Sequence, residues 1–206
     1  RATVLRTMRK FFDEHGYTEV ETPILQNIPG GASAKPFITH FNALNIDMYM
    51  RIATELYLKR LIVGGFEGVY EIGKNFRNEG MDRFHNPEFT CMELYVPYKD
   101  YNWMMTFTEQ LLETICVAVN GKPEVEYPDG KVVSFKAPFK RLPILDAIKE
   151  KTGFDLDCKS EEEIRDIAVN KLKMEGIDGS FGKGKLIDEI FGEFCEGTFI
   201  QPTFIT

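Results

Sequence analysis

Residues 76–95, FRNEGMDRFHNPEFTCMELY, decide the expected fold, because their second half alternates between polar or aromatic and aliphatic side chains. In a β-strand, residues two positions apart share a face. One face of this strand would carry Phe89, Cys91, Glu93 and Tyr95, and the other would carry Met92, Leu94 and Val96. The sequence therefore predicts a strand with an apolar face toward a core and a second face that bears functional groups.

The stretch just before it has the same alternation. Tyr70, Ile72 and Phe76 alternate with Glu71, Gly73, Asn75 and Arg77. Two such strands, paired antiparallel, would present an arginine, carboxylates and an aromatic ring to one surface. We interpret this surface as the floor of a binding site and refer to it below as the polar face.

Composition limits the class of protein. The 206 residues are 43% hydrophobic and 13% aromatic, so the chain is long enough to bury the core of one large soluble domain, or of a domain with an insertion. A formal charge of −7 excludes a strongly basic nucleic-acid-binding module. No apolar run approaches the roughly 20 residues that cross a bilayer, so no membrane association is expected.

Metal binding is not expected from the residues of this segment. The four cysteines are far apart and form no Cys-x-x-Cys pair, and only three histidines accompany them. The sequence starts without Met and ends in the strand-like IQPTFIT at residues 200–206, so we expect a piece of a longer protein.

Hydrophobic spacing predicts an α+β fold in which helices flank an antiparallel sheet. Helices are expected over residues 1–15, 54–62 and 101–119, from Ser160 to about Met174, and over 186–194. A short strand is expected over 17–21, an extended stretch over 37–44, and a hairpin that turns at YPDG, residues 127–130. These elements suggest a core over 1–119, a mostly helical insertion over 120–182 and a return to the core over 183–206.

Four side chains within residues 1–119 suggest chemistry, and three of them have a plainer alternative. Arg77 would clamp a phosphate or carboxylate with two parallel hydrogen bonds, or form a salt bridge with Glu79 or Glu93. Phe89 would stack on a base or pack in the core. Glu55 lies in a first helical turn, where a carboxylate is favoured without any function. Glu93, between two apolar neighbours, is costly to bury without a cation.

Two blocks of sequence resemble a known family. GYTEVETP at residues 16–23 is similar to motif 1 of the class II aminoacyl-tRNA synthetases, and FRNE at 76–79 with HNPEFT at 85–90 is similar to their motif 2. Within that class, GGASAKPFITHFNAL at 30–44, MRIATELYLKRL at 50–61 and IQPTFIT resemble the bacterial-type lysyl enzymes. The resemblance covers essentially the whole chain.

The resemblance implies a cytoplasmic homodimer that activates L-lysine with ATP to lysyl-adenylate and transfers it to tRNA(Lys). Catalysis would rest on Arg77; ATP would be bound by Arg77, Glu79, His85, Asn86 and Phe89, and lysine by Gly31, Glu55, Arg77, Glu93 and Tyr95. Pro23 would lie at the dimer interface. Mg²⁺ would accompany ATP, with its ligands beyond residue 206.

The sequence departs from the family pattern and leaves alternatives open. The Arg-containing motif 3, the acidic Mg²⁺ ligands and the N-terminal anticodon-binding barrel of the family are missing, so we expect this segment to be inactive alone. Phe84 occupies a loop position that is basic in some relatives. The rival interpretations are the related enzyme that modifies elongation factor P, and a binding module for ATP and lysine without catalysis. Specificity for aspartate or asparagine is disfavoured, because Glu93 would repel an acidic substrate side chain.

Overall fold

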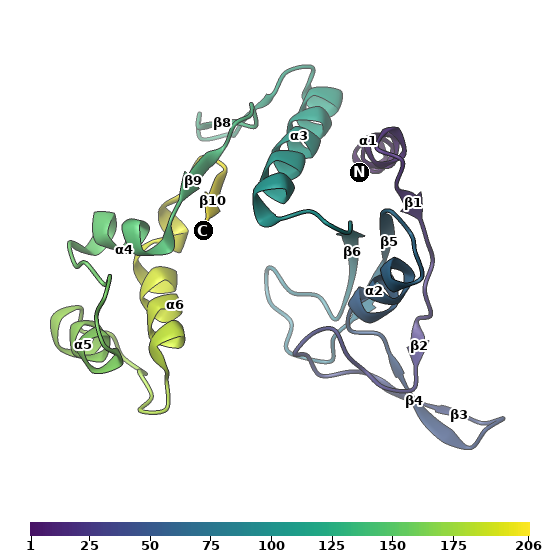
Figure 1. Ribbon diagram of the computed structural model, residues 1–206, viewed down its shortest axis with the longest axis horizontal. Helices are drawn as coiled ribbons and strands as arrows, with labels where there is room; N and C mark the ends of the chain where they lie inside the picture. Colours follow the sequence, from purple (N-terminus) through teal and green to yellow (C-terminus); the bar gives the residue numbers. More distant parts are fainter. The chain divides into compact units, whose positions relative to one another are not determined.

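The computed structural model describes residues 1–206 and contains helices and several small sheets, a mixed α and β architecture (Figure 1). Its packing divides the chain into two compact units, Arg1–Trp103 and Met104–Thr206. The three-part division with boundaries at residues 119 and 182 stays a prediction. No helix combines the length and the apolar character needed to span a membrane.

A three-stranded sheet organises the first unit. β5 (Val69–Phe76) pairs with β1 (Thr18–Glu19) in parallel and with β6 (Glu88–Tyr95) in antiparallel orientation, so the predicted hairpin pairing is confirmed. Directly opposite positions share a face. The register places Glu71 opposite Glu93, Gly73 opposite Cys91 and Asn75 opposite Phe89. The polar face therefore runs across both strands.

Helix α1 (Ala2–Glu14) covers the other face of this sheet. Its Phe12 is fully buried, and the Phe12 ring lies 4.5 Å from the ring of Tyr70, which is also fully buried. Gly16, at a φ of 75°, turns the chain after the helix so that Tyr17 donates its N–H back to the Phe12 carbonyl. The tyrosine and phenylalanine rings thus secure α1 on the face opposite the polar one.

The rest of the first unit is a second small sheet and one helix. β2 (Leu25–Gln26) and β3 (Ile38–Phe41) both pair with β4 (Ile46–Met50), and helix α2 (Glu55–Val63) follows. The extended stretch expected over 37–44 is wrong at its end: β3 stops at Phe41, and a turn reverses the chain. Asn45 adopts a φ of 52° in that turn, a conformation that asparagine tolerates well.

The second unit is mainly helical. Helix α3 (Tyr101–Asn120) contains the boundary between the units and is followed by the hairpin strands β7 (Glu124–Glu126) and β8 (Val132–Ser134). The next elements are β9 (Lys140–Leu142), α4 (Ile144–Thr152), α5 (Glu161–Asp166) and a π-helical turn (Ile167–Lys171). The chain then forms α6 (Lys183–Phe194), a short 3₁₀ turn (Glu196–Thr198) and β10 (Thr203–Ile205). Its core includes the fully buried Ile148, Leu156, Ile164, Leu186 and Ile190.

Local sequence signals in the second unit predict the start of α5 but not the end of its helix. The capping box is confirmed: Glu163 donates its N–H to the Ser160 hydroxyl at 3.2 Å, and the Glu163 carboxylate accepts the Ser160 N–H at 2.8 Å. The helix predicted to reach Met174 instead becomes π-helical after Asp166 and ends at Lys171. The parallel pairing of β9 with β10, about sixty residues apart, had no local signal.

A buried carboxylate fixes the strand β9 to α3 within the second unit. Glu109 accepts both terminal nitrogens of Arg141, at 2.8 and 3.0 Å, and the N–H of Phe139 at 2.9 Å. Burial alone would raise the pKa of Glu109, but these hydrogen bonds and the guanidinium charge outweigh it and hold the pKa below its ordinary value. The charged form of Glu109 therefore stabilises the folded state.

Replacing Glu109 with Gln in the full-length protein should lower the free energy of unfolding at pH 7 by about 1–3 kcal/mol, because a buried charge-assisted pair is lost. A carboxylate with a lowered pKa contributes stability above its unfolded pKa of about 4.3, and the contribution disappears as the pH falls. The difference between the two proteins in urea titrations should therefore shrink below about pH 4.

The matched control is Glu150→Gln, which removes an exposed ion pair with Lys140, 3.8 Å apart. This change should cost less than about 0.5 kcal/mol at any pH. Equal losses for the two variants, or a Glu109→Gln effect that grows in acid, would contradict the role assigned to the Glu109–Arg141 pair.

Candidate functional site

Arg77 and Phe89 meet at one end of the polar face. Arg77 donates its N–H to the carbonyl of Pro87 at 2.8 Å, which continues the β5–β6 ladder by one residue and keeps Arg77 on the face of Phe89. The guanidinium carbon lies 5.2 Å from the centre of the Phe89 ring, a cation–π contact. The Nε atom donates to the carbonyl of Ile52 at 3.4 Å. The guanidinium is therefore held by neutral groups.

The salt bridges considered for Arg77 are not formed. Glu79 accepts the backbone N–H of Lys35 at 3.1 Å, and the Lys35 carbonyl accepts the N–H of Asn78 at 2.7 Å. Glu93 accepts a hydrogen bond from Tyr95. Because both carboxylates have other partners, the charge of Arg77 remains available for an anion that binds here.

A cavity of about 260 Å³ opens beside Arg77. It is lined by Arg77, Glu79, Gly80, Phe84, His85, Asn86 and Phe89. All five residues expected to bind ATP are in that set. The cavity therefore combines a cationic group, a carboxylate and two aromatic rings in a volume that suits a planar, partly anionic ligand.

The loop between β5 and β6 is folded by a residue that the sequence reasoning missed. The Asp82 carboxylate accepts the N–H groups of Phe84 at 2.7 Å and His85 at 2.8 Å, and it contacts the ring Nδ1 of His85 at 2.7 Å. The backbone hydrogen bond from Phe84, followed by that from the His85 ring, lowers the pKa of Asp82. An aspartate two to three residues before the residues it caps is the signal that predicts this turn.

Glu93 and Tyr95 form the other end of the polar face. The Tyr95 hydroxyl donates to Glu93 Oε2 at 3.2 Å. Burial, and then the negative charges of Glu93 and Glu55, raise the pKa of Tyr95 above its ordinary value. The phenol is therefore neutral at physiological pH and lies in the field of two carboxylates. This field attracts a cation and repels an anion.

Gly31 approaches the same end from the segment before β3. Gly31 has a φ of 86°, and a Cβ atom there would lie 3.0 Å from the Cβ of Glu55 and 3.2 Å from that of Ala53. Both the conformation and the space favour glycine. Glu55 itself accepts a hydrogen bond from Lys59, one helical turn later, at 2.6 Å. A ligand ammonium that uses Glu55 would therefore share it with Lys59.

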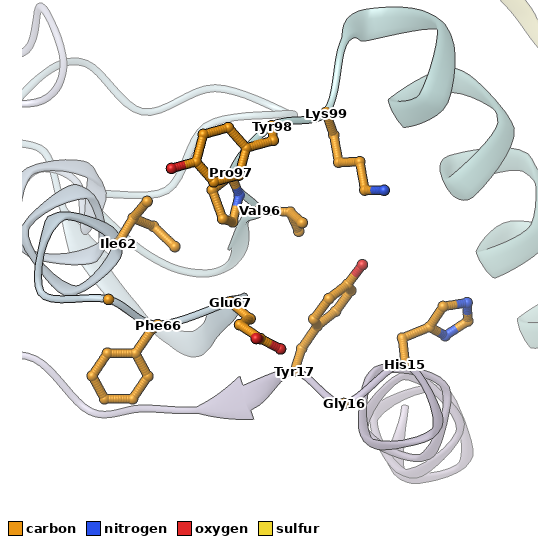
Figure 2. A pocket seen from close by; sticks show the side chains of 11 residues that line it. His15, Gly16, Tyr17, Ile62, Phe66, Glu67, Val96, Pro97, Tyr98 and Lys99 are labelled. Carbon is orange, nitrogen blue, oxygen red and sulfur yellow. The ribbon is translucent and has the colours of Figure 1, made fainter.

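A larger pocket of about 530 Å³ lies elsewhere in the first unit (Figure 2). Figure 2 shows it between the turn after α1, which carries His15 and Tyr17, and the segment after β6, which carries Pro97, Tyr98 and Lys99. No predicted site residue lines it. Arg77 and Phe89 of the polar face line the smaller cavity, whereas Glu93, Tyr95, Gly31 and Glu55 lie outside its lining. We assign the candidate site to this cavity and the adjoining polar face rather than to the larger pocket.

Comparison with known proteins identifies the family. The chain matches the family described as tRNA synthetases class II (D, K and N) over residues 1–204. The chain belongs to the class II tRNA synthetases.

Lysine–tRNA ligases are among its similar proteins. The chain is 65% identical over 206 residues to the lysine–tRNA ligase of Christiangramia forsetii and 62% identical over 206 residues to that of Porphyromonas gingivalis strain W83. It is 55% identical over 205 residues to that of Azobacteroides pseudotrichonymphae. All of this chain is covered in each comparison, against 36%, 35% and 40% of the relatives. This class II chain therefore spans little more than a third of their length.

A spectrophotometric titration of the phenols in the full-length protein tests whether the pKa of Tyr95 is raised. Tyr95→Phe should leave the absorbance change at 295 nm between about pH 9 and pH 11 unchanged, because the Tyr95 phenol keeps its proton beyond the ordinary value of about 10. The fully exposed Tyr98, changed to Phe, calibrates the signal of one phenol. A Tyr95→Phe variant that loses one phenol's signal in this range would refute the assignment, provided circular dichroism reports a folded protein.

Proposed function

We propose that the full-length protein is a lysine–tRNA ligase, which activates L-lysine with ATP and transfers the lysyl group to tRNA(Lys). The observation that carries the proposal is the identity of 62–65% to two lysine–tRNA ligases over the whole chain. The polar face supports it independently, since it offers one group for each part of lysyl-adenylate. We also propose that the β5–β6 sheet belongs to the catalytic core, that a mostly helical insertion follows it, and that the protein is cytoplasmic.

Arg77 is the proposed catalytic residue. When the lysine carboxylate attacks the α-phosphate of ATP, two anions approach, and negative charge builds up on the phosphate oxygens. A fixed guanidinium that faces both groups lowers this barrier, because the charge is already in place before the reaction. Arg77 suits the role because its Nε is tied to the Ile52 carbonyl and its plane lies over the Phe89 ring.

The proposed adenine site is the cavity beside Arg77. Phe89 would stack on the base, and Glu79 would accept a hydrogen bond from its amino group while holding the Lys35 N–H. His85 and Asn86 line the same cavity from the β5–β6 loop and would contact the phosphates and the base. Asp82 fixes His85 in that loop.

Magnesium would neutralise part of the triphosphate charge when bound. The described residues contain no group of three or more His, Cys, Asp or Glu side chains that could hold a metal ion. From the resemblance to the family, we propose that the ligands of Mg²⁺ belong to the rest of the full-length protein.

Lysine selectivity is proposed to come from Glu93 and Tyr95, which would receive the ε-ammonium group. Gly31, whose close approach to Glu55 and Ala53 leaves no space for a side chain, would hold the α-ammonium together with Glu55. A substrate with a neutral side chain would leave the Glu93 carboxylate desolvated and without a cation, at a cost of several kcal/mol. Like-charge repulsion disfavours aspartate in the same place.

Dimerisation is proposed through the segment around Pro23. Pro23 lies in a shallow pocket with Leu25, Asn27, Ile28, Met48, Leu56, Tyr57 and Arg60. Leu25 and Ile28, which line this pocket, are exposed by 48% and 78%, so apolar surface is available here. A second copy of the same surface would cover both.

Glu93→Gln in the full-length enzyme should reduce lysine-dependent ATP–pyrophosphate exchange by about 100-fold or more, through loss of the cation's partner. The melting temperature should change little, because no protein cation pairs with Glu93. The matched control is Glu88→Gln on the same strand and the opposite face, where Glu88 pairs with Lys74 at 2.9 Å. This variant should keep near-normal exchange. Normal exchange in Glu93→Gln would rule out the lysine site proposed here.

Sedimentation of the full-length protein tests the dimer. The wild type is expected to sediment as a dimer, and Ile28→Asp should raise the dissociation constant of the dimer by at least about tenfold, because a charge would be buried without a partner. Val132→Asp, at a position exposed by 46% in the β7–β8 hairpin, provides the control and should leave the dimer intact. A wild-type monomer, or equal effects of the two changes, would contradict the interface.

A further inference from the structure

Arg51 is the most deeply buried charged side chain of the first unit, and the proposed chemistry gives it no role. It is 2% exposed and follows β4 directly. Its Nε donates to the Lys74 carbonyl at 2.8 Å, and its Nη1 donates to the Thr22 carbonyl at 3.1 Å, the Thr22 hydroxyl at 3.2 Å and Glu71 Oε1 at 2.5 Å. One guanidinium therefore joins three separate segments of the chain.

The backbone of Arg51 joins the same segments. Its N–H donates to the Ile24 carbonyl at 2.8 Å, and its carbonyl accepts the N–H of Phe76 at 2.9 Å. The next carbonyl, that of Ile52, accepts Nε of Arg77. Arg51 thus holds residues on both sides of Pro23. Through Phe76 it is linked to the backbone of Arg77, the proposed catalytic arginine, and through the Ile52 carbonyl to the Arg77 side chain.

The guanidinium lies on the polar face itself. A Cβ atom at Gly73 would overlap Nη2 of Arg51 and lie 3.2 Å from Glu71 Oε1. Gly73 is opposite Cys91 and between Glu71 and Asn75 on that face. The absence of a side chain at Gly73 is therefore what allows Arg51 to lie flat against β5. None of the four hydrogen bonds of the side chain uses Nη2.

The buried charges compensate each other in a geometry that lysine cannot reproduce. Glu71 is 4% exposed, accepts Arg51 on one oxygen and accepts the Thr22 hydroxyl on the other at 2.6 Å. A guanidinium has five donors in one rigid plane, whereas an ammonium is a compact point charge. A lysine at position 51 would still balance the charge of Glu71. Its ammonium could not also donate hydrogen bonds to Thr22 and to the Lys74 carbonyl in the geometry that the planar guanidinium provides.

We propose that Arg51 is a positioning residue for Arg77: by tying the segment around Pro23 to the end of β5, it sets the position from which Arg77 meets the reacting carboxylate and phosphate. The proposal rests on the proposed lysine activation. It assigns to Arg51 an effect on the reaction that exceeds its effect on folding. A displacement of about 1 Å at a group that stabilises the transition state lowers the rate by up to about 100-fold.

The test uses the full-length enzyme with three single variants. Arg51→Lys keeps the charge, and Thr22→Val removes only the hydroxyl that joins Arg51 to Glu71. Arg141→Lys is the control, since it weakens the pair of a half-buried arginine with the buried Glu109 in the second unit. Steady-state ATP–pyrophosphate exchange gives kcat and the KM values for lysine and ATP. Thermal unfolding reports how much stability each change costs.

Arg51→Lys should lower kcat by about 10- to 100-fold, with a change of less than about threefold in the KM for lysine, because the lost contact acts on the transition state. Thr22→Val should lower kcat by about threefold to tenfold, and Arg141→Lys should lose comparable stability with a normal kcat. In the Arg77→Lys background, Arg51→Lys should lower kcat little further, since both changes remove the same contribution, that of a correctly placed Arg77 guanidinium.

Equal kcat values for Arg51→Lys and Arg141→Lys, or full additivity with Arg77→Lys, would overturn the positioning role. If Arg51→Lys does not fold, Thr22→Val decides alone, and a normal kcat in that variant overturns the proposal. A wild type that binds ATP in calorimetry but gives no lysine-dependent exchange refutes the proposed function instead. In that case, the ATP dissociation constants of the variants test Arg51, with about tenfold weakening expected in Arg51→Lys only.

Discussion

The antiparallel register of β5 and β6 is the constraint on which the site depends. With Asn75 opposite Phe89 and Glu71 opposite Glu93, every functional side chain of the two strands emerges on one face. A shift of β6 by one residue relative to β5 would move Phe89, Glu93 and Tyr95 to the side covered by α1. The core that holds this register is on that side, where the Phe12 and Tyr70 rings are fully buried. Packing on one face thus fixes the chemistry of the other.

Opposite charges are separated along this face. The cationic end at Arg77 is beside an aromatic ring and a cavity of about 260 Å³, while the end at Glu93 and Tyr95 is anionic and raises the pKa of its phenol. A ligand that carries a phosphate at one end and an ammonium at the other matches both ends at once. Under the proposed function, this charge pattern would orient an aminoacyl-adenylate along the hairpin, with Gly31 and Glu55 completing the site.

Alternation and local turn chemistry made much of this predictable from sequence. The period of two residues places Arg77, Phe89 and Glu93 on a common face, and Ser160 with Glu163 identifies the start of α5. What the sequence lacked were signals for contacts between distant segments. Arg51 is an unremarkable residue after a strand until Gly73, twenty-two positions later, makes room for it. Asp82 differs, because its hydrogen bonds to Phe84 and His85 are local, and an aspartate in a polar loop has many possible partners in the sequence alone.

The most direct test of the shared face is a crystal structure of the full-length protein with a non-hydrolysable lysyl-adenylate analogue. The account predicts adenine on the Phe89 ring, the phosphate mimic at Arg77 and the ε-ammonium within hydrogen-bond distance of Glu93 and Tyr95. An analogue bound in the pocket of His15 and Tyr17, or one whose ammonium points away from Glu93, would contradict it.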